Sequence, residues 1–184
     1  MITINPSELS PMQVQMILQT AVAPRPIALA STIDKNGNVN LSPFSFFNLF
    51  SSNPPILIFS PARRVRDHST KDTLHNVLEV PEVVIGNVNF DMVQQVSLSS
   101  TEYETGVDEF IKSGLTKKPA ELVKPPLIAE SPVNFECKVI KVKPLGNEGG
   151  AGNLVICEVL KIHIKEEFLN EEGNLDQKKL DLVS

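Results

Sequence analysis

The sequence predicts a mainly β fold, an antiparallel barrel with flanking helices, in a single domain spanning residues 1–184. Its apolar runs are short and turn residues recur between them, which is typical of all-β barrels. The two longest strand-like runs, residues 133–142 and 153–165, are separated by one glycine-rich loop and predict a hairpin. Alternating strand–helix units do not occur, which argues against a Rossmann nucleotide-binding unit. A generic α+β sandwich is the alternative fold.

A helix is expected first along the chain. Ser10 is a suitable N-cap, Pro11 suits the first helical turn, and Gln13 can complete a capping box. Apolar residues then recur at helical spacing until Pro24 and Pro26 end the helix and impose an extended backbone.

Three strands are expected next. Residues 27–33 and 38–41 predict two strands joined by a hairpin turn, because Asn36-Gly37 tolerates positive φ. Residues 56–59 follow two prolines and form an apolar run too short for a helix, so they predict a buried strand.

The middle of the chain predicts two helices around one strand. Leu74, Val77 and Leu78 recur at helical spacing, and an amphipathic helix is expected to begin at Asn89. Residues 82–88 between them are rich in β-branched residues, as strands are.

Residues 99–126 form a polar excursion with several Gly and Pro residues. Strands resume immediately afterwards, so its length favours a functional excursion over a linker. The neighbouring acids Asp108 and Glu109 in it are expected to be solvated. The later loop, residues 143–152, holds four glycines and predicts a flexible hairpin connection, since no phosphate-binding motif accompanies them.

Composition and charge restrict the class of protein. Hydrophobic residues make up 41% and charged residues 21% of the chain, the usual mix for a globular domain. The net charge is −5, most of it from residues 166–184, and no long basic run favours nucleic acid. No stretch reaches the roughly 20 apolar residues of a membrane span, and the N-terminus lacks a signal-peptide pattern. We therefore expect a cytoplasmic protein with neither nucleic-acid nor membrane partners.

Residues with intrinsic reactivity are few. Cys137 and Cys157 lie in apolar runs and are expected to be buried free thiols, with a cross-strand disulfide as the alternative. His68, His75 and His163 lack metal-ligand spacing and are expected to be structural or surface residues. GxSxG does not occur either. If the protein is an enzyme, a bound cofactor is expected to supply the reactivity.

Four of the nine Phe residues lie within a short, proline-bounded segment, residues 41–55. They alternate with Ser and Asn: Phe44, Phe46, Phe47 and Phe50. Such a segment can form a slot for a flat conjugated ligand, with rings against its faces and hydroxyls and amides at its edges. The alternative is a core strand that ends in a Ser/Asn turn.

A basic cluster precedes the expected helix at Leu74. It consists of Arg63, Arg64 and Arg66, followed by Ser69, Thr70, Lys71 and Thr73. A helix N-terminus attracts anions and adjacent cations reinforce it, so this cluster is a candidate phosphate anchor. The alternative is a capped helix beside a solvated basic loop.

These segments, taken in order along the chain, resemble the flavin reductase-like FMN-binding family of split β-barrel flavoproteins, of the NAD(P)H:flavin oxidoreductase and flavoredoxin type. The resemblance runs from about residue 21 to residue 163. The segments that carry it are PRPIALAST (24–32), SPFSFFN (42–48), SSNPP (51–55), KDTLHN (71–76), GVDEF (106–110) and IAESPVNFEC (128–137).

The resemblance implies a split β-barrel of the Greek-key type that binds FMN noncovalently and forms a homodimer, with the flavin near the subunit interface. It implies a phosphate contact for Lys71 and Thr73, and a weaker candidate contact for Asn87. The implied flavin contacts are Ser31, Thr32, Ser45, Phe46, Phe47, Asn48, Ser51, Ser52 and Asn53.

The resemblance also implies an activity. Hydride would pass from NADH or NADPH to the flavin, and electrons would then pass to a further acceptor that the sequence does not identify. An FMN electron carrier and a non-catalytic dimeric flavin-binding protein are the alternatives. Family members continue into a short tail with basic and aromatic residues, where this sequence ends at Leu182-Val183-Ser184.

Overall fold

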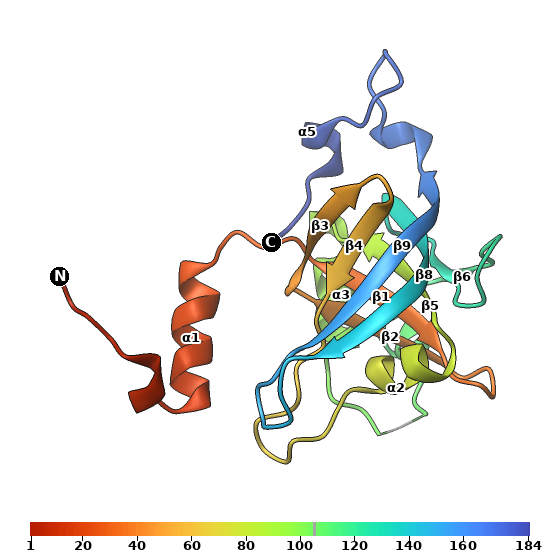
Figure 1. The fold of residues 1–184 in the computed structure, drawn as a ribbon. Coiled ribbons are helices and arrows are strands. Elements are labelled where there is room, and N and C mark those ends of the chain that lie inside the picture. Colours follow the sequence, from red (N-terminus) through yellow and green to blue (C-terminus); the bar gives the residue numbers. More distant parts are fainter. Residues whose placement is uncertain (105) are drawn as a thin grey trace.

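A computed structural model describes residues 1–104 and 106–184, which form an antiparallel sheet with short helices around it (Figure 1). The large sheet of these residues has seven strands in the order β2-β1-β5-β8-β9-β4-β3, and β6 pairs with β7 in a separate two-stranded sheet. The strands are β1 (Ala28–Ile33), β2 (Val39–Phe44), β3 (Phe47–Ser52), β4 (Pro55–Phe59), β5 (Glu82–Asn87), β6 (Lys117–Lys118), β7 (Leu127–Ile128), β8 (Val133–Pro144) and β9 (Asn153–Ile164). The helices are η1 (Pro6–Glu8), α1 (Pro11–Ala21), α2 (Asp72–Glu79), η2 (Phe90–Met92), α3 (Val93–Ser99), α4 (Glu109–Ser113), η3 (Glu166–Phe168) and α5 (Gln177–Leu180).

The sheet is rolled up but not closed. Its two edge strands are β2 and β3, yet only Ser45 and Phe46 connect them along the chain. A connection of this length spans about 10 Å, so the two edges lie close together where β2 ends and β3 begins. The predicted mainly β, barrel-like fold is therefore confirmed, with an opening between β2 and β3.

Two apolar clusters stabilise the two faces of the rolled sheet. Alternate residues of β1 illustrate the division, because Ala28 and Ala30 face inward while Leu29 faces the outer cluster. The inner cluster also contains Phe44, Leu57, Phe59, Val83, Ile85, Cys137, Val139, Val155 and Cys157, with Leu74 and Val77 from α2. The outer cluster places β1, β2 and β5 against α3, α4 and β7 through Leu41, Val84, Met92, Val96, Phe110, Leu115, Leu127 and Ile128.

The N-terminal helix α1 begins as the sequence predicts. The Ser10 backbone N–H donates to Gln13 Oε1 at 3.0 Å, and the Gln13 N–H donates to Ser10 Oγ at 3.4 Å, which completes the capping box. None of the helix's residues is buried, and in Figure 1 it stands beside the barrel as a separate arm. Its large exposed side chains are Met12, Met16, Ile17, Leu18 and, at the C-cap, Val22.

The loop between β8 and β9 packs against the segment after β4. Gly150 N–H donates to the Arg63 carbonyl at 2.9 Å, and Arg63 N–H donates to the Ala151 carbonyl at 2.9 Å. A Cβ at Gly149 would lie 2.8 Å from Val65 Cα, so a glycine is required there by close approach of the two backbones. The glycine-rich connection between the two hairpin strands is therefore confirmed. It packs against the basic segment that contains Arg63.

Several details differ from the sequence-based expectations. The return strand β2 continues to Phe44, beyond residue 41, and β3 is an additional strand with a bulge between Leu49 and Ser51. The excursion contains α4 and β6, and β7 follows directly after it. The expectation that Glu109 is solvated is wrong, since its side chain is buried against β2.

Two further expectations can be compared with the structure. Cys137 and Cys157 are buried free thiols, as the first alternative stated, and burial raises the pKa of the Cys137 thiol to about 12. Among the described residues no helix combines the length and apolar character needed to cross a membrane.

Candidate functional site

Three of the predicted site residues meet where α2 packs against β1 and β2. Thr73 Oγ1 donates to Asn40 Oδ1 at 2.7 Å, and Asn76 Nδ2 donates to Thr32 Oγ1 at 3.1 Å. Thr73 and Thr32 are both fully buried, so these hydroxyls hold the helix against the sheet. Lys71 is the N-cap residue of α2 and lies at the outer end of this contact.

Lys71 is a half-buried cation at the wall of a cavity of about 160 Å³. Its Nζ lies 4.9 Å from the centroid of the Phe44 ring, and among the described residues its ammonium group has no hydrogen bond or ion pair. Burial lowers the pKa of Lys71, and the neighbouring Arg64 charge lowers it further. The cavity is lined by Asn40, Ser42, Arg64, Lys71, Asp72, Ser100, Thr101, Glu102, Tyr103 and Glu109. Lys71 is therefore a group suited to binding an anion, beside the carboxylates of Asp72, Glu102 and Glu109 in the same cavity.

Two arginines of the basic cluster, Arg64 and Arg66, are paired with Glu102. Arg64 donates to Ser69 Oγ at 2.9 Å and to the Thr70 carbonyl at 3.2 Å, and its Nε lies 3.1 Å from Glu102. Arg66 contacts the same Glu102 carboxylate at 2.9 Å. These two guanidinium groups stabilise the segment before α2, whereas the Lys71 ammonium and the buried Arg63 Nε have no hydrogen-bond partner among the described residues.

A second group of predicted residues, Phe47, Asn48 and Asn87, lines an apolar cavity of about 210 Å³. Its other walls are Pro26, Ile27, Leu49, Leu57, Val88, Phe135, Leu182 and Val183. Leu182 and Val183 reach it because the chain after α5 pairs with residues 88–90, where Val183 N–H donates to the Val88 carbonyl at 3.1 Å. A mainly apolar hollow with two amide side chains suits a flat ring with polar edges.

One row of the sheet runs from Phe44, near the first cavity, to Asn87, at the second. Ala28 pairs with Phe44 of β2 on one side and with Asn87 of β5 on the other. Adjacent strands lie about 4.8 Å apart, so Phe44 and Asn87 are separated by roughly 10 Å across this row. Lys71 Nζ lies over the Phe44 ring and Asn87 lines the apolar hollow, so this row relates the positions of the two cavities.

The remaining predicted residues lie elsewhere. Ser31 faces the outer cluster, opposite to Thr32, and its buried Oγ has no hydrogen-bond partner among the described residues. Ser45 and Phe46 form the link across the barrel opening, and Phe46 lines a third cavity of about 480 Å³ between α1 and the barrel. Ser51, Ser52 and Asn53 lie at the far end of β3 and line none of these three cavities.

Of the four clustered Phe residues, only Phe44 belongs to the core. Its ring packs on Phe59 with centroids 5.2 Å apart, and Phe47 packs against the same cluster while half-buried. Phe46 and Phe50 are exposed. The core-strand alternative therefore holds at Phe44, and the slot for a flat ligand stays a prediction.

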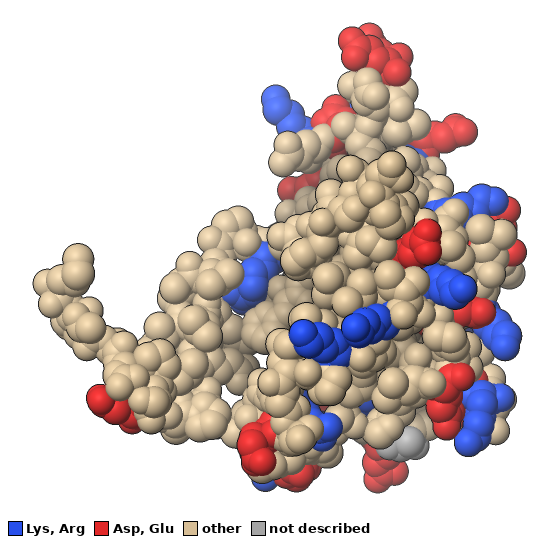
Figure 2. All heavy atoms as spheres, in the orientation of Figure 1, with Lys and Arg blue, Asp and Glu red and all other residues tan. Residues whose placement is uncertain are grey.

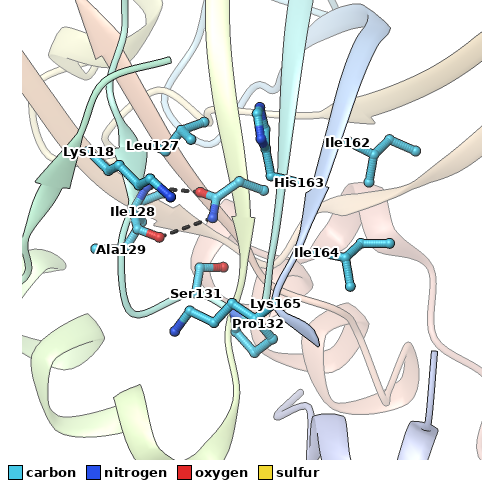
Figure 3. A pocket seen from close by; sticks show the side chains of 11 residues that line it. Lys118, Leu127, Ile128, Ala129, Ser131, Pro132, Ile162, His163, Ile164 and Lys165 are labelled. Carbon is cyan, nitrogen blue, oxygen red and sulfur yellow. Dashed lines mark hydrogen bonds between the residues drawn. The ribbon is translucent and has the colours of Figure 1, made fainter. Parts of the chain in front are cut away.

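Another hollow, of about 340 Å³, lies between β7 and β9 and contains none of the predicted site residues (Figure 3). Lys118 and Lys165 flank it, and the buried Asn134 amide bonds to both the N–H and the carbonyl of Ile128. His163 Nε2 lies 2.6 Å from Glu136 Oε1 at the wall of this hollow. No cluster of three or more metal-ligating side chains occurs among the described residues.

Sequence reasoning missed three residues near Lys71. Asn40 and Ser42 lie on alternate positions of β2 and line its cavity, as does Glu109. The polar alternation on β2 is a signal that could have identified the first two. Glu109 gave no such signal, because its partners on β2 are far away in the sequence.

Known proteins resemble this chain over nearly its whole length. The family model described as "Flavin reductase like domain" matches residues 21–179. An uncharacterized protein from Halalkalibacterium halodurans is 37% identical over 183 residues, which cover 98% of this chain and 87% of that protein.

Solved structures share the whole fold. Nitrilotriacetate monooxygenase component B from Bacillus cereus superimposes with a TM-score of 0.92 at 27% identity, covering 99% of this chain and 90% of that one. A putative flavin reductase with a split barrel domain from Shewanella frigidimarina gives a TM-score of 0.80 at 23% identity, covering 96% and 85%. The rolled, open sheet described above is therefore a split barrel.

Proposed function

The chain belongs to the family of flavin reductase like domains, and from this premise we propose that it is an FMN-dependent oxidoreductase that takes hydride from NADH or NADPH. The observation that carries the proposal is the half-buried Lys71 ammonium over Phe44, which has no hydrogen bond or ion pair among the described residues, together with the apolar hollow at Asn87, two strands along the sheet from Phe44. A ligand with a phosphate at one end and a flat ring at the other matches that arrangement.

The residues on hand fit FMN. Lys71 would bind the phosphate by charge, with the N-terminus of α2 beside it. Phe47, Asn48 and Asn87 would enclose the ring and shield one face from water. Bound FMN would supply the hydride and electron chemistry, which the protein's own side chains do not offer. The protein's contribution is to orient the reactants and exclude water.

The likeness to component B of a monooxygenase supports a specific type of acceptor. We propose that reduced flavin or its electrons pass to a partner oxygenase in the cytoplasm. An FMN electron carrier is the second candidate, favoured if flavin is held tightly but nicotinamide nucleotides reduce it slowly. Anaerobic stopped-flow mixing with NADH and with NADPH separates the two, because rapid loss of the flavin's visible absorption occurs only in a reductase.

The exposed helix α1 supports a homodimer. An isolated helix of this length is marginal in water, so its apolar side chains need a partner surface. Glu8 is the only charged side chain among residues 1–24, and Figure 2 shows the arm almost free of charge. Phe46, Leu49 and Phe50, in and beside β3 at the barrel opening, are exposed apolar side chains too. In a two-fold dimer, the arm of each copy would cover these side chains of the other.

The flavin assignment is tested with Lys71→Ala. FMN should bind about 10- to 100-fold more weakly, since a charge-assisted bond contributes about 1.5–3 kcal/mol. Riboflavin, which lacks the phosphate, should bind unchanged. Both dissociation constants are measured by quenching of flavin fluorescence on titration of apoprotein.

Lys118→Ala is the matched control, because Lys118 flanks the separate hollow of Figure 3. It should bind both flavins normally. Equal FMN affinity in Lys71→Ala and the unaltered protein would refute the phosphate contact. Failure of the unaltered protein to bind either flavin would refute the flavoprotein proposal itself.

A further inference from the structure

A buried carboxylate lies behind the Lys71 site. Glu109 is the first residue of α4 and its exposed fraction is only 7%. Its Oε1 accepts a hydrogen bond from Asn40 Nδ2 at 2.7 Å, and its Oε2 accepts one from the Leu41 N–H at 3.0 Å. Both oxygens are therefore directed at β2, and neither donor can be replaced by water without exposing this interface.

The contact continues from Asn40 to the start of α2. With its amide nitrogen donating to Glu109, Asn40 presents its Oδ1 to Thr73, whose hydroxyl donates to it at 2.7 Å. Thr73 is in the first turn of α2, two residues after the N-cap Lys71. The carboxylate thus sets the orientation of one amide, and that amide fixes the helix start that carries the cation.

Charge links the same two residues. Glu109 and Lys71 line the same cavity, and the carboxylate raises the pKa of Lys71 against the opposing effects of burial and of Arg64. Burial raises the pKa of Glu109 itself, while the donors Leu41 N–H and Asn40 lower it. A neutral residue at position 109 would remove both the acceptor for β2 and the nearby negative charge.

We propose that Glu109 is a positioning residue for the anion anchor, holding the start of α2 and Lys71 in place through Asn40 and Thr73 so that the site selects a phosphorylated flavin. This inference rests on the proposed function, since it assumes that Lys71 binds the FMN phosphate. It assigns a specificity role to the polar excursion, residues 99–126, which contains α4.

The test is Glu109→Gln, with FMN and riboflavin as probes. Glutamine keeps the size of the side chain but turns an N–H group toward the Leu41 N–H or the Asn40 amide, so one of the two bonds is lost. FMN should bind about tenfold more weakly while riboflavin affinity stays the same. Damage to the fold as a whole would weaken both flavins, so the ratio of the two dissociation constants separates positioning from stability.

Glu136→Gln is the matched control, because Glu136 is also a buried carboxylate that accepts backbone hydrogen bonds from the excursion. Its ratio of FMN to riboflavin affinity should equal that of the unaltered protein. Glu109→Asp is a milder second variant, which keeps the charge and should give an intermediate ratio.

The outcomes distinguish the two proposals. If Lys71→Ala lowers the preference for FMN but Glu109→Gln and Glu109→Asp do not, the positioning role is overturned and the phosphate contact stands. If Lys71→Ala leaves the preference unchanged, the phosphate contact is wrong and the positioning role falls with it. A reduced preference in both Glu109 variants, with Glu136→Gln normal, supports the inference.

Discussion

At the residue scale, buried carboxylates act as anchors for the polar excursion. Glu136 on β8 is fully buried and accepts hydrogen bonds from the N–H groups of Glu121, Leu122 and Val123 at 2.6–3.1 Å. His163 Nε2 lies 2.6 Å from Oε1 of the same carboxylate. Burial pushes the pKa of Glu136 upward, but these donors outweigh it and hold the pKa below the ordinary value of 4.5.

Glu136→Gln should therefore destabilise the protein by about 3 kcal/mol at neutral pH, since several donors lose a charged acceptor. A carboxylate whose pKa is lowered by folding contributes its full stabilisation at pH values above its ordinary pKa. This stabilisation is lost as the pH falls through the pKa of the folded state. The difference in unfolding free energy between variant and parent should thus shrink from about pH 6 to about pH 3. Urea unfolding at both pH values measures it, and a pH-independent difference would contradict the assignment.

At the element scale, local patterns predicted the strands and helices well. Capping residues located α1, and β-branched runs located β5, β8 and β9, because these signals depend on neighbours in the sequence. The strand β3 was missed because its exposed, bulged residues lack the regular alternation of a half-buried strand.

The candidate site was only partly predictable, for a related reason. Lys71 was recognisable as a candidate from its place before a helix. The sequence did not show how deeply the Ser and Thr side chains of the site are buried. Thr73, Thr32 and Ser31 are completely buried, and that depends on packing of α2 and α4 against the sheet. The contact between Glu109 and Asn40 joins residues whose proximity no short pattern expresses.

The β8–β9 loop provides a prediction for this scale. In Gly149→Ala the new Cβ would lie 2.8 Å from Val65 Cα and 2.9 Å from the Val65 carbonyl oxygen. Moving the Val65 backbone to relieve this clash costs free energy, so we expect a loss of stability of about 1–3 kcal/mol. We also expect weaker FMN binding, because the basic segment is displaced. Thermal unfolding and FMN titration measure the two effects.

Gly146→Ala in the same loop is the control, because its Cβ would meet only the Ala151 side chain at 3.2 Å. It should be milder in both measurements. Equal effects of the two substitutions would show that the close approach at Gly149 is not what matters.

At the scale of the whole molecule, charge and apolar surface are separated. Acidic side chains gather at the tip of the segment between η3 and α5, whereas the α1 arm is nearly uncharged (Figure 2). Arg25 donates to the carbonyls of Gln19 and Val22 at the end of the arm, which fixes the direction in which α1 leaves the barrel. The arm is thereby presented to another molecule.

Met16→Glu should dissociate the proposed dimer. Met16 is 62% exposed in one chain, and burying a carboxylate in an apolar contact is costly. We expect the dimer dissociation constant to rise at least about 100-fold, which corresponds to about 3 kcal/mol. Sedimentation equilibrium measures it.

Gln15→Glu adds the same charge to a polar position of the same helix and should leave the dimer intact. A monomeric unaltered protein at micromolar concentration, or dissociation by both substitutions alike, would argue against the arm as the dimer contact.

The strand order of the large sheet delays the pairing of one hairpin during folding. Ile56 of β4 pairs with Glu158 of β9, so the β3–β4 hairpin has no second neighbour until β9 has been synthesised. Pairings of such long range slow folding, to milliseconds or longer in comparable β-rich domains. During translation the Leu49 and Phe50 edge and an unpaired β4 are both accessible, which makes this hairpin the segment most in need of protection from aggregation on the ribosome.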